Sequence, residues 1–479
     1  MTDPTAELSA ALRNMRSLVG NSADLSVREI TVGENRIPAA LMWIEGLVDK
    51  KSLHETVLAP LLSANIPSEL ADSPPKLMDY VVRSTITAPG VERFFAAEAA
   101  VSKLVGGWTL LLANNGGEIV AVDTQGYAKR NIEEAATSTV IRGPRDGFVE
   151  SLDINISLIR RRVRSGDVRV EKITLGQLSR TDVAMLYVNG KAPRAVVDEV
   201  RGRLAKLNIE GILESQYIEE RIKDGPRSFF PTVYSTERPD DIAGIIMEGR
   251  VGILVDGTPF ALGLPSTLPQ HLQTTEDLYL AYPIATFVRW IRYLGFFFTL
   301  LLPSVYVGIL TYHPEIVPPQ LLSSILSARD GVPFPVLMEA LVMEVIFEGL
   351  REASIRMPRS IGSAISIVGA LVIGESAVQA GIISSPAVIV VAGTAIASFT
   401  IPSVSLSGAI RILRFGMLFL ASLLGLYGIM IGLFLMAIHL SALSSIGVPY
   451  LKPFAPGTGR ALEKTIFRIP WSQAKKGGK

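Results

Sequence analysis

The sequence contains no cysteine among its 479 residues. This absence excludes structural disulfides, thiolate zinc sites, iron–sulfur clusters and cysteine nucleophiles together. Histidine is scarce, with four in the whole chain, and no two of them have the spacing of metal ligands. The chain also lacks a P-loop, a paired-glycine nucleotide fingerprint and the HExxH and GxSxG motifs. We expect no catalytic residues, no cofactor and no metal site, and therefore predict that the protein is not an enzyme.

Neither sign of charge dominates, because 46 Lys and Arg residues balance 45 Asp and Glu residues. The net charge of +1 excludes a generally basic nucleic-acid binder, so no nucleic-acid partner is expected. The first 20 residues also lack an apolar core segment. We therefore expect no cleaved signal peptide and a cytoplasmic N-terminal region.

Charge is nearly missing from three long stretches in the C-terminal part. Residues 293–312 and 415–451 contain no Asp, Glu, Lys or Arg, and residues 361–410 contain only Glu375. A helix needs about 20 apolar residues to span a bilayer. The sequence therefore predicts an all-α transmembrane bundle at 285–450 behind a large soluble head, followed by a basic tail at 451–479.

Two stretches of the head, about 143 residues apart, resemble one another. One begins at Val27 and the other at Val170, and each predicts a strand, a glycine, a second apolar strand and an amphipathic helix. A β-hairpin follows in each stretch, with turns at Asn114–Gly117 and Asp256–Thr258. We predict a tail at 1–21 and then two similar tandem α/β subdomains, at 22–140 and 166–280.

A linking helix is predicted between the two subdomains, at 141–165, from apolar residues at helical spacing. It ends in a cluster of arginines: Arg160, Arg161, Arg162 and Arg164. Such a cluster can bind acidic lipid or nucleic acid. Because the net charge is near zero, we favour a solvated helix end that complements the helix dipole.

Four or five spans are predicted in the membrane part. Four of them are residues 293–312, 361–381, 384–401 and a long helix at about 413–440. Residues 336–356 are apolar but carry four glutamates, so they either span the bilayer with an acidic stripe or lie along its surface. Five spans place the basic tail outside and four place it inside, and the charges leave both possibilities open.

The segment 361–381 has small residues along one side and large apolar residues along the other. Close helix packing explains this pattern, and so does a narrow path enclosed by copies of the helix. The candidate pore-lining residues are Gly362, Ser366, Gly369, Ala370, Ile373 and Ala377. Ile373 is the large residue among them and the candidate constriction.

Several segments are similar to the A subunits of GerA-type spore germinant receptors. They are RGPRDGFVESLDINISLIRRRVR (142–164), residues 236–262, LPSVYVGILTYHPEIVP (302–318), residues 334–403 and GVPYLKPFAP (447–456). Together they cover the chain from about residue 145 to the end. Residues 1–140 share only the α/β repeat character.

The resemblance implies a multi-pass protein in the spore inner membrane, in contact with membrane lipid, with its head on the spore-core side. It implies a homo-oligomer, by this resemblance a pentamer, that forms a nutrient-gated channel for monovalent cations. Its partners would be a transporter-like B subunit and a lipoprotein C subunit. The segment 361–381 then becomes the favoured pore helix, and an acidic vestibule has the candidates Glu344, Glu348, Glu352 and Glu375. Two alternatives stay open: a SpoVAF-type subunit that works with the dipicolinate channel, and a non-conducting membrane scaffold.

Overall fold

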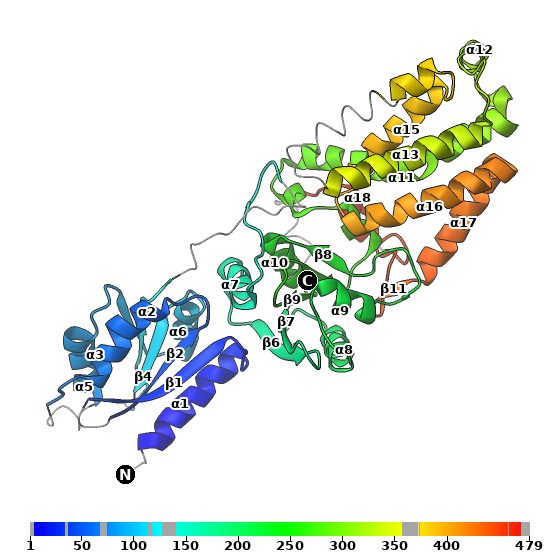
Figure 1. Cartoon of the computed structure of the whole chain (residues 1–479). Helices are drawn as coiled ribbons and strands as arrows, with labels where there is room; N and C mark the ends of the chain where they lie inside the picture. Colours follow the sequence, from blue (N-terminus) through cyan, green and yellow to red (C-terminus); the bar gives the residue numbers. More distant parts are fainter. Residues whose placement is uncertain are drawn as a thin grey trace. The chain divides into compact units, whose positions relative to one another are not determined.

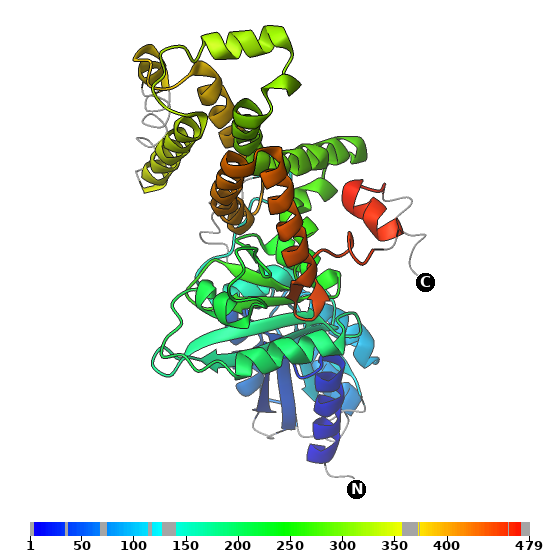
Figure 2. The ribbon, with the colours of Figure 1, turned by 90° about the vertical axis from the view of Figure 1, so that its right-hand side faces the viewer.

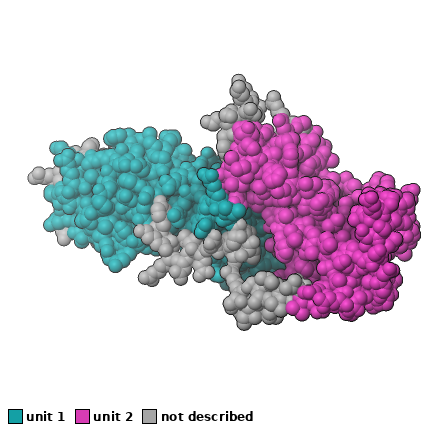
Figure 3. All heavy atoms as spheres, turned by 90° about the horizontal axis from the view of Figure 1, so that it is seen from above, with its two compact units in different colours: residues 1–226, 233–265 teal, residues 227–232, 266–479 magenta. Residues whose placement is uncertain are grey.

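The computed structural model describes residues 4–33, 37–67, 74–113, 117–126, 140–356, 372, 374–457 and 459–470. The chain divides into two compact units, coloured separately in Figure 3. The first comprises residues 1–226 and 233–265, and is called the head unit below. The second comprises residues 227–232 and 266–479, and is called the helical unit.

The described part of the head unit contains two five-stranded antiparallel sheets with equivalent strand orders (Figure 1). The first, in the order β1-β2-β4-β5-β3, consists of β1 (Leu25–Val32), β2 (Ile37–Ile44), β3 (Val91–Phe94), β4 (Thr109–Ala113) and β5 (Ile119–Val122). The second, in the order β6-β7-β9-β10-β8, consists of β6 (Val168–Leu175), β7 (Thr181–Val188), β8 (Tyr234–Thr236), β9 (Val251–Val255) and β10 (Ala261–Leu264). The predicted hairpins are present, because β4 pairs with β5 and β9 pairs with β10. The expectation of an α/β head is thus confirmed.

The first sheet is covered on both faces, as the sequence of β2 requires. Alternate residues of a strand point to opposite faces, and here both sets are apolar and buried: Leu41 joins one hydrophobic cluster, and Met42 joins the other. On the Leu41 side lie α2 (Lys50–Leu53), η1 (His54–Leu58), α3 (Ala59–Leu62), α5 (Pro74–Tyr80) and η2 (Val81–Thr85). On the Met42 side lie α1 (Pro4–Val19) and α6 (Ala97–Leu104).

Helix α1 corrects the expectation of an N-terminal tail at 1–21. Leu8, Leu12, Met15 and Val19 are spaced three or four residues apart, so they lie along one face of a helix. All four are buried against the first sheet. The segment is therefore part of the core of the head unit.

The second sheet carries α7 (Leu152–Arg162) and α10 (Pro239–Met247), which share one hydrophobic cluster with β6, β7 and β9. Helices α8 (Arg194–Ala205) and α9 (Ser215–Ile222) contact each other and the strands β9 and β10 respectively. Helix α7 falls inside the predicted linking helix at 141–165 but is shorter. It begins at Leu152, after Ser151 in the N-cap position.

The two sheets are joined by a buried ion pair. Arg160 is 0% exposed, and its Nε and Nη2 donate to the two carboxylate oxygens of Asp24 at 2.8 and 3.0 Å. Its Nη2 also donates to Ser22 Oγ at 2.9 Å, and the amide of Ala23 donates to the carbonyl of Val170 at 2.8 Å. The interpretation of Arg160 as part of a solvated helix end is therefore wrong. It binds the end of α7 to the turn that precedes β1.

The described elements of the helical unit are mainly helices. They are η3 (Leu268–Leu272), η4 (Thr275–Leu278), α11 (Tyr282–Tyr312), η5 (Pro314–Ile316), α12 (Pro319–Ser327), α13 (Val336–Arg356), α15 (Ser385–Ser398), α16 (Val404–Leu424), α17 (Leu426–Ala442), a small hairpin of β11 (Ser444–Ser445) and β12 (Val448–Pro449), and α18 (Gly459–Ile466). Helix α11 is central and contacts α13, α15, α16 and α17 (Figures 1 and 2). Gly295 of α11 faces Thr400, and Gly308 faces Gly425, so small residues permit these close approaches.

The long helix predicted at about 413–440 is wrong, because the chain reverses at Gly425. This residue has φ of +62° and separates α16 from α17, which folds back along α16. A Cβ atom on Gly428 would collide with the carbonyl of Leu420, and one on Gly432 would collide with Met417. The glycines that the sequence places in one helix thus serve the contact between two helices.

Two of the described helices, α11 and α16, are long and apolar enough to cross a membrane. Helices α15 and α17 are apolar but have 14 and 17 residues. Helix α13 has 21 residues and carries the glutamates of the predicted stripe. The expectation of a helical C-terminal region is confirmed, and the number of spans stays a prediction.

Candidate functional site

Four charged side chains meet between α13 and α16 in the helical unit. Glu344 and Glu348 come from α13, and Arg411 and Arg414 come from α16; these four residues are called the ion-pair cluster below. Arg414 Nη2 lies 2.6 Å from a carboxylate oxygen of Glu344 and 3.2 Å from one of Glu348. Arg411 Nη1 lies 3.0 Å from the other oxygen of Glu348.

The spacing along each helix explains why the four groups meet. Residues three or four apart share one face of a helix, so Glu344 and Glu348 form one stripe and Arg411 and Arg414 form another. The side chains of Glu344 and Arg414 are 1% and 2% exposed. Both charges lie out of contact with water and depend on each other for stabilisation.

Several polar atoms at the ion-pair cluster make no hydrogen bond in the described structure. They are both carboxylate oxygens of Glu344, the Nε atoms of Arg411 and Arg414, and Nη1 of the neighbouring Arg351. Arg351 lies over the ring of Phe399, 5.6 Å from its centroid. A buried carboxylate that has an ionic partner but no hydrogen bond is stabilised incompletely. Ion pairs therefore connect α13 to α16, but several buried polar atoms at this contact have no hydrogen bond.

A second buried carboxylate, Glu339, holds the N-terminus of α15. It is 0% exposed and accepts hydrogen bonds from the amide and hydroxyl of Ser384 at 3.1 and 2.6 Å. Arg329 Nη2 donates to its other oxygen at 2.8 Å. A carboxylate at a helix N-terminus is favoured by the unpaired amides and the helix dipole. Glu339 is thus separate from the ion-pair cluster, because it lies on the side of α13 opposite to Glu344 and Glu348.

A third buried carboxylate anchors the start of α11. Asp277 in η4 is 0% exposed, and its two oxygens accept from Arg289 Nε and Arg292 Nη1, both at 2.8 Å. Arg289 also donates to the carbonyl of Lys464 in α18 at 3.0 Å. These two arginines, which precede the first apolar run, bind η4 and α18 to the beginning of α11.

The predicted vestibule acids do not share one environment. Glu344 and Glu348 are paired with arginines in the ion-pair cluster, as described above. Glu352 is exposed and pairs with Arg356 on its own helix at 2.7 Å. Glu375 is exposed and accepts from Gln379 at 3.0 Å.

Of the predicted pore-lining residues, only Ala377 lies within the described residues. It packs against the apolar cluster that contains Met343, Ile383 and Val391. The other five lie outside the described residues: Gly362, Ser366, Gly369, Ala370 and Ile373. Their role stays a prediction from the helical pattern.

Sequence reasoning missed the partners of the glutamate stripe. It found the stripe on α13 but did not assign Arg411 and Arg414 as its partners. A signal was present, because two arginines three residues apart in an apolar helix complement two glutamates four residues apart in another. The missed residues Asp277 and Arg329 gave no comparable pattern.

No metal centre is evident in the part of the chain that the structure describes, where no three His, Cys, Asp or Glu residues are grouped for metal binding. Two of the described histidines instead contact hydroxyl groups. His271 Nε2 lies 3.0 Å from Ser266 Oγ, and His439 Nε2 lies 2.8 Å from Ser228 Oγ. His313 ends α11 in the C-cap position.

The comparisons with known proteins agree across most of the chain. A family model described as Bacillus/Clostridium GerA spore germination protein matches residues 13–478. Spore germination protein KA of Bacillus subtilis (strain 168) is 44% identical over 455 residues, which are 95% of this chain and 82% of that protein. Stage V sporulation protein AF of the same organism is 30% identical over 463 residues, which are 96% of this chain and 91% of that protein.

One solved structure is also similar to part of the chain. It is the crystal structure of the N-terminal domain of the A subunit of the Bacillus megaterium spore germinant receptor GerK3. The identity is 31%, the match covers 55% of this chain and 95% of that one, and the TM-score is 0.42.

Proposed function

The chain belongs to the GerA family of spore germination proteins, and from this membership we propose that it is the A subunit of a germinant receptor. In this proposal several copies, a pentamer by family resemblance, form a channel in the spore inner membrane. Nutrient binding to the receptor opens the channel, and monovalent cations leave the spore core. A transporter-like B subunit and a lipoprotein C subunit complete the receptor, and the head lies on the core side.

The observation that best supports a role beyond anchoring is the ion-pair cluster. Charged groups within membrane helices are costly, and they mark ion paths or switching contacts more often than passive anchors do. A scaffold needs only apolar helices, whereas this chain buries Glu344 and Arg414 at 1% and 2% exposure between two of them. Helix α13, which supplies the glutamates, leads directly into the segment proposed to line the pore.

The course of the chain through the helical unit supports a multi-pass arrangement. Helix α16 runs parallel to α11, because Ser403 lies beside His271 near the start of α11 and Tyr312 donates to the carbonyl of Ser422 at the other end. Helices α13 and α15 run the opposite way. Val336 packs near Val307, and Thr400 faces Gly295.

The chain enters and leaves the helical unit at the same end. Helix α17 returns from Gly425 to the loop of Tyr450, whose carbonyl accepts from the amide of Leu268. Ala377, near the end of the predicted span 361–381, packs beside Met343 in the first half of α13. We infer six passes, with the basic tail on the same side as the entry to α11. The even number follows from the reversal at Gly425 and from counting 336–356 as a span.

Within the proposal, the segment 361–381 lines the pore and Ile373 is its constriction. Glu352 and Glu375 are the stronger vestibule candidates, because both are exposed in the single chain. Glu344 and Glu348 are neutralised by arginines, so they serve better as a contact between α13 and α16. The 44% identity to spore germination protein KA, against 30% to Stage V sporulation protein AF, favours the germinant-receptor branch over the SpoVAF-type alternative.

The test is current through the reconstituted protein. The purified chain, alone and with its B and C partners, is placed in planar bilayers, and Ile373→Ala is expected to conduct monovalent cations without nutrient because its constriction is removed. Ile396→Ala is the matched control, since Ile396 lies on α15 and is 68% exposed. The channel proposal fails if neither the native receptor with nutrient nor Ile373→Ala passes current; a non-conducting scaffold would then remain.

A further inference from the structure

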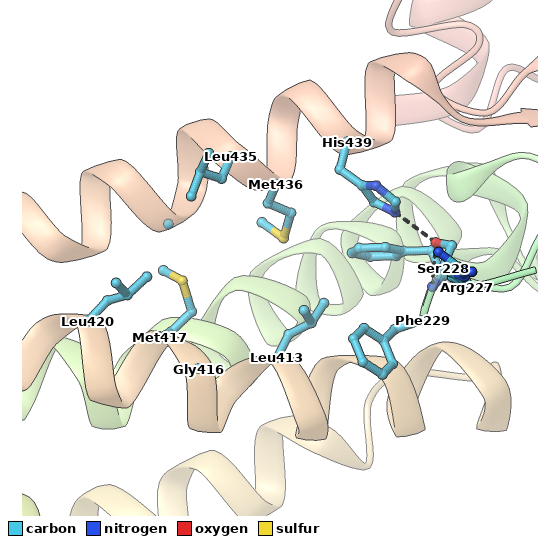
Figure 4. Close-up of a pocket in the computed structure, with 12 residues that line it drawn as sticks. Arg227, Ser228, Phe229, Leu413, Gly416, Met417, Leu420, Leu435, Met436 and His439 are labelled. Atoms are coloured by element: carbon cyan, nitrogen blue, oxygen red, sulfur yellow. Dashed lines mark hydrogen bonds between the residues drawn. The ribbon is translucent and has the colours of Figure 1, made fainter. Parts of the chain in front are cut away.

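An apolar groove lies between α16 and α17 and is closed at one end by residues 227–230 (Figure 4). Its volume is about 520 Å³. Leu413, Met417 and Leu420 line it from α16, and Leu435 and Met436 line it from α17. This set of residues defines the α16–α17 groove. Its walls consist almost entirely of aliphatic and thioether side chains, which suit a hydrocarbon chain.

Polar groups gather at one end of the α16–α17 groove only. There His439 Nε2 and Ser228 Oγ lie 2.8 Å apart, and Arg227 stands beside them (Figure 4). Arg227 is exposed, and within the described residues it forms no salt bridge or side-chain hydrogen bond. The groove is therefore apolar over most of its length and polar at one end, where Arg227 carries a positive charge.

The apolar surface continues outside the groove on both helices. The outward residues include Phe419, Leu423, Tyr427, Phe434 and Ile438, each at least 50% exposed. Helix α17 contains no charged residue along its length. Large apolar side chains in this arrangement face hydrocarbon in a membrane protein. The groove thus opens toward lipid, and its polar end lies near the end of α17, where a headgroup would be.

We propose that the α16–α17 groove binds one anionic phospholipid, with an acyl chain along Met417 and Met436 and the phosphate at Arg227 and His439. A phosphate matches an arginine that has no carboxylate partner among the described residues, and basic pockets between membrane helices on the cytoplasmic side bind such headgroups. The small residue Gly416 makes room for the chain, since a Cβ atom added to it would have no neighbouring atom within 4 Å. The proposal rests on membrane insertion of the helical unit and not on ion conduction.

The test is native mass spectrometry of the full-length chain in detergent, titrated with phosphatidylglycerol. Phosphatidylcholine with the same acyl chains and inorganic phosphate are the comparison probes. We expect one retained phosphatidylglycerol per chain and at least tenfold weaker retention of phosphatidylcholine. Inorganic phosphate should not compete at equal concentration, because the acyl chain supplies most of the contact.

Two variants locate the site. Arg227→Gln should weaken phosphatidylglycerol retention about tenfold, which corresponds to about 1.4 kcal/mol. Gly416→Leu should abolish it by filling the groove, and this substitution meets no atom within 4 Å at its Cβ. The matched controls are Arg221→Gln, an exposed arginine of the head unit, and Gly349→Leu, an exposed and equally open glycine of α13. Both should retain phosphatidylglycerol like the native chain.

Several results would overturn the proposal. The proposal fails if phosphatidylcholine and phosphatidylglycerol are retained equally, or if inorganic phosphate alone competes. It also fails if binding is unchanged in both site variants. A lipid-free dimer whose formation Gly416→Leu abolishes would also count against it, since a second copy would then occupy the groove. Melting temperatures of the variants within a few degrees of the native value show that a loss of binding is not a loss of folding.

Discussion

Arg414 forms ion pairs with two glutamates, so we expect its substitution to destabilise the helical unit. Arg414→Gln leaves Glu344 buried without its nearest cation, and removing one partner of a buried ion pair costs about 3–5 kcal/mol. The melting temperature of the full-length chain in detergent should fall accordingly. Glu344→Gln/Arg414→Gln should recover most of the loss, because neither charge then remains at this pair.

The matched control for Arg414 is Arg356→Gln. Arg356 pairs with Glu352 at 2.7 Å, but both side chains are exposed, at 78% and 60%. Such surface pairs contribute about 0–1 kcal/mol. If Arg414→Gln and Arg356→Gln lowered the melting temperature equally, the ion-pair cluster would stabilise the helical unit no more than a surface pair does.

Glu219 in α9 predicts a pH dependence of the head unit. The residue is 6% exposed, and burial raises the pKa of its carboxyl to about 7. Two smaller effects act on the same pKa: the charge of Lys223 lowers it and the charge of Glu214 raises it. The folded chain therefore binds the proton more tightly than the unfolded chain, so stability falls as pH rises from about 4.5 to 7. The loss is complete above pH 7. At about 1.4 kcal/mol per pKa unit, it is on the order of 3 kcal/mol.

Hydrogen–deuterium exchange of the α9 amides in the full-length chain measures this effect. Corrected for the intrinsic rates, protection should be lower at pH 8 than at pH 5. Glu219→Gln should remove the difference and raise protection at pH 8 by an amount equivalent to about 1–3 kcal/mol. Glu220→Gln, at the exposed neighbouring position, is the control and should leave the difference in place. A pH difference that persists in Glu219→Gln would contradict the assignment.

At the scale of elements, Gly425 decides whether the C-terminal apolar run is one helix or two. Its φ of +62° and ψ of −139° belong to a region that is open essentially to glycine alone. A Cβ there would lie 2.9 Å from His313 and from Tyr312. We expect Gly425→Ala to destabilise the chain by about 2–4 kcal/mol, which thermal unfolding in detergent would register.

Gly416→Ala is the control for that prediction, because it adds the same methyl group to the same pair of helices. Gly416 is helical and has no atom within 4 Å of the added carbon. Alanine there should be neutral or stabilising by up to about 1 kcal/mol. If both alanine variants melted at the native temperature, the reversal at Gly425 would not require glycine.

Elements with a complete local pattern were predictable from the sequence. The hairpins β4–β5 and β9–β10 follow from apolar runs on either side of polar, glycine-containing turns. Helix α1 was missed although Leu8, Leu12 and Met15 have helical spacing. The polar residues between them led to the prediction of a tail. The break at Gly425 was missed because glycines at 425, 428 and 432 are also the pattern of a continuous helix that packs closely.

At the scale of the whole molecule, the six inferred passes predict on which side of the membrane each part lies. The chain contains no cysteine, so a single introduced cysteine is the only thiol to label. Ser102→Cys in the head unit and Ser472→Cys in the tail should react with an impermeant maleimide from one side of sealed vesicles. Asp330→Cys, in the turn before α13, should react from the other.

Permeabilised vesicles provide the control, since all three variants should then label fully. We expect at least a tenfold difference between the two sides before permeabilisation. Labelling of Ser472→Cys and Asp330→Cys from the same side would require an odd number of passes. The arrangement proposed from the reversal at Gly425 would then be wrong.

The sequence by itself determined the class of the protein: an α/β head, a helical apolar part, and membership in a family recognisable along most of the chain. These features follow from local periodicity, charge-free runs and extended similarity, all of which can be read along the chain. It also identified the glutamate stripe of α13.

Only the tertiary structure decided that Arg411 and Arg414 neutralise that stripe, that Arg160 is buried against Asp24, and that the chain reverses at Gly425. The physical reason is separation, because Glu348 and Arg414 are 66 residues apart in sequence and Asp24 and Arg160 are 136 apart. Periodicity shows which face of a helix is charged, whereas the partner of that charge is set by packing between distant segments.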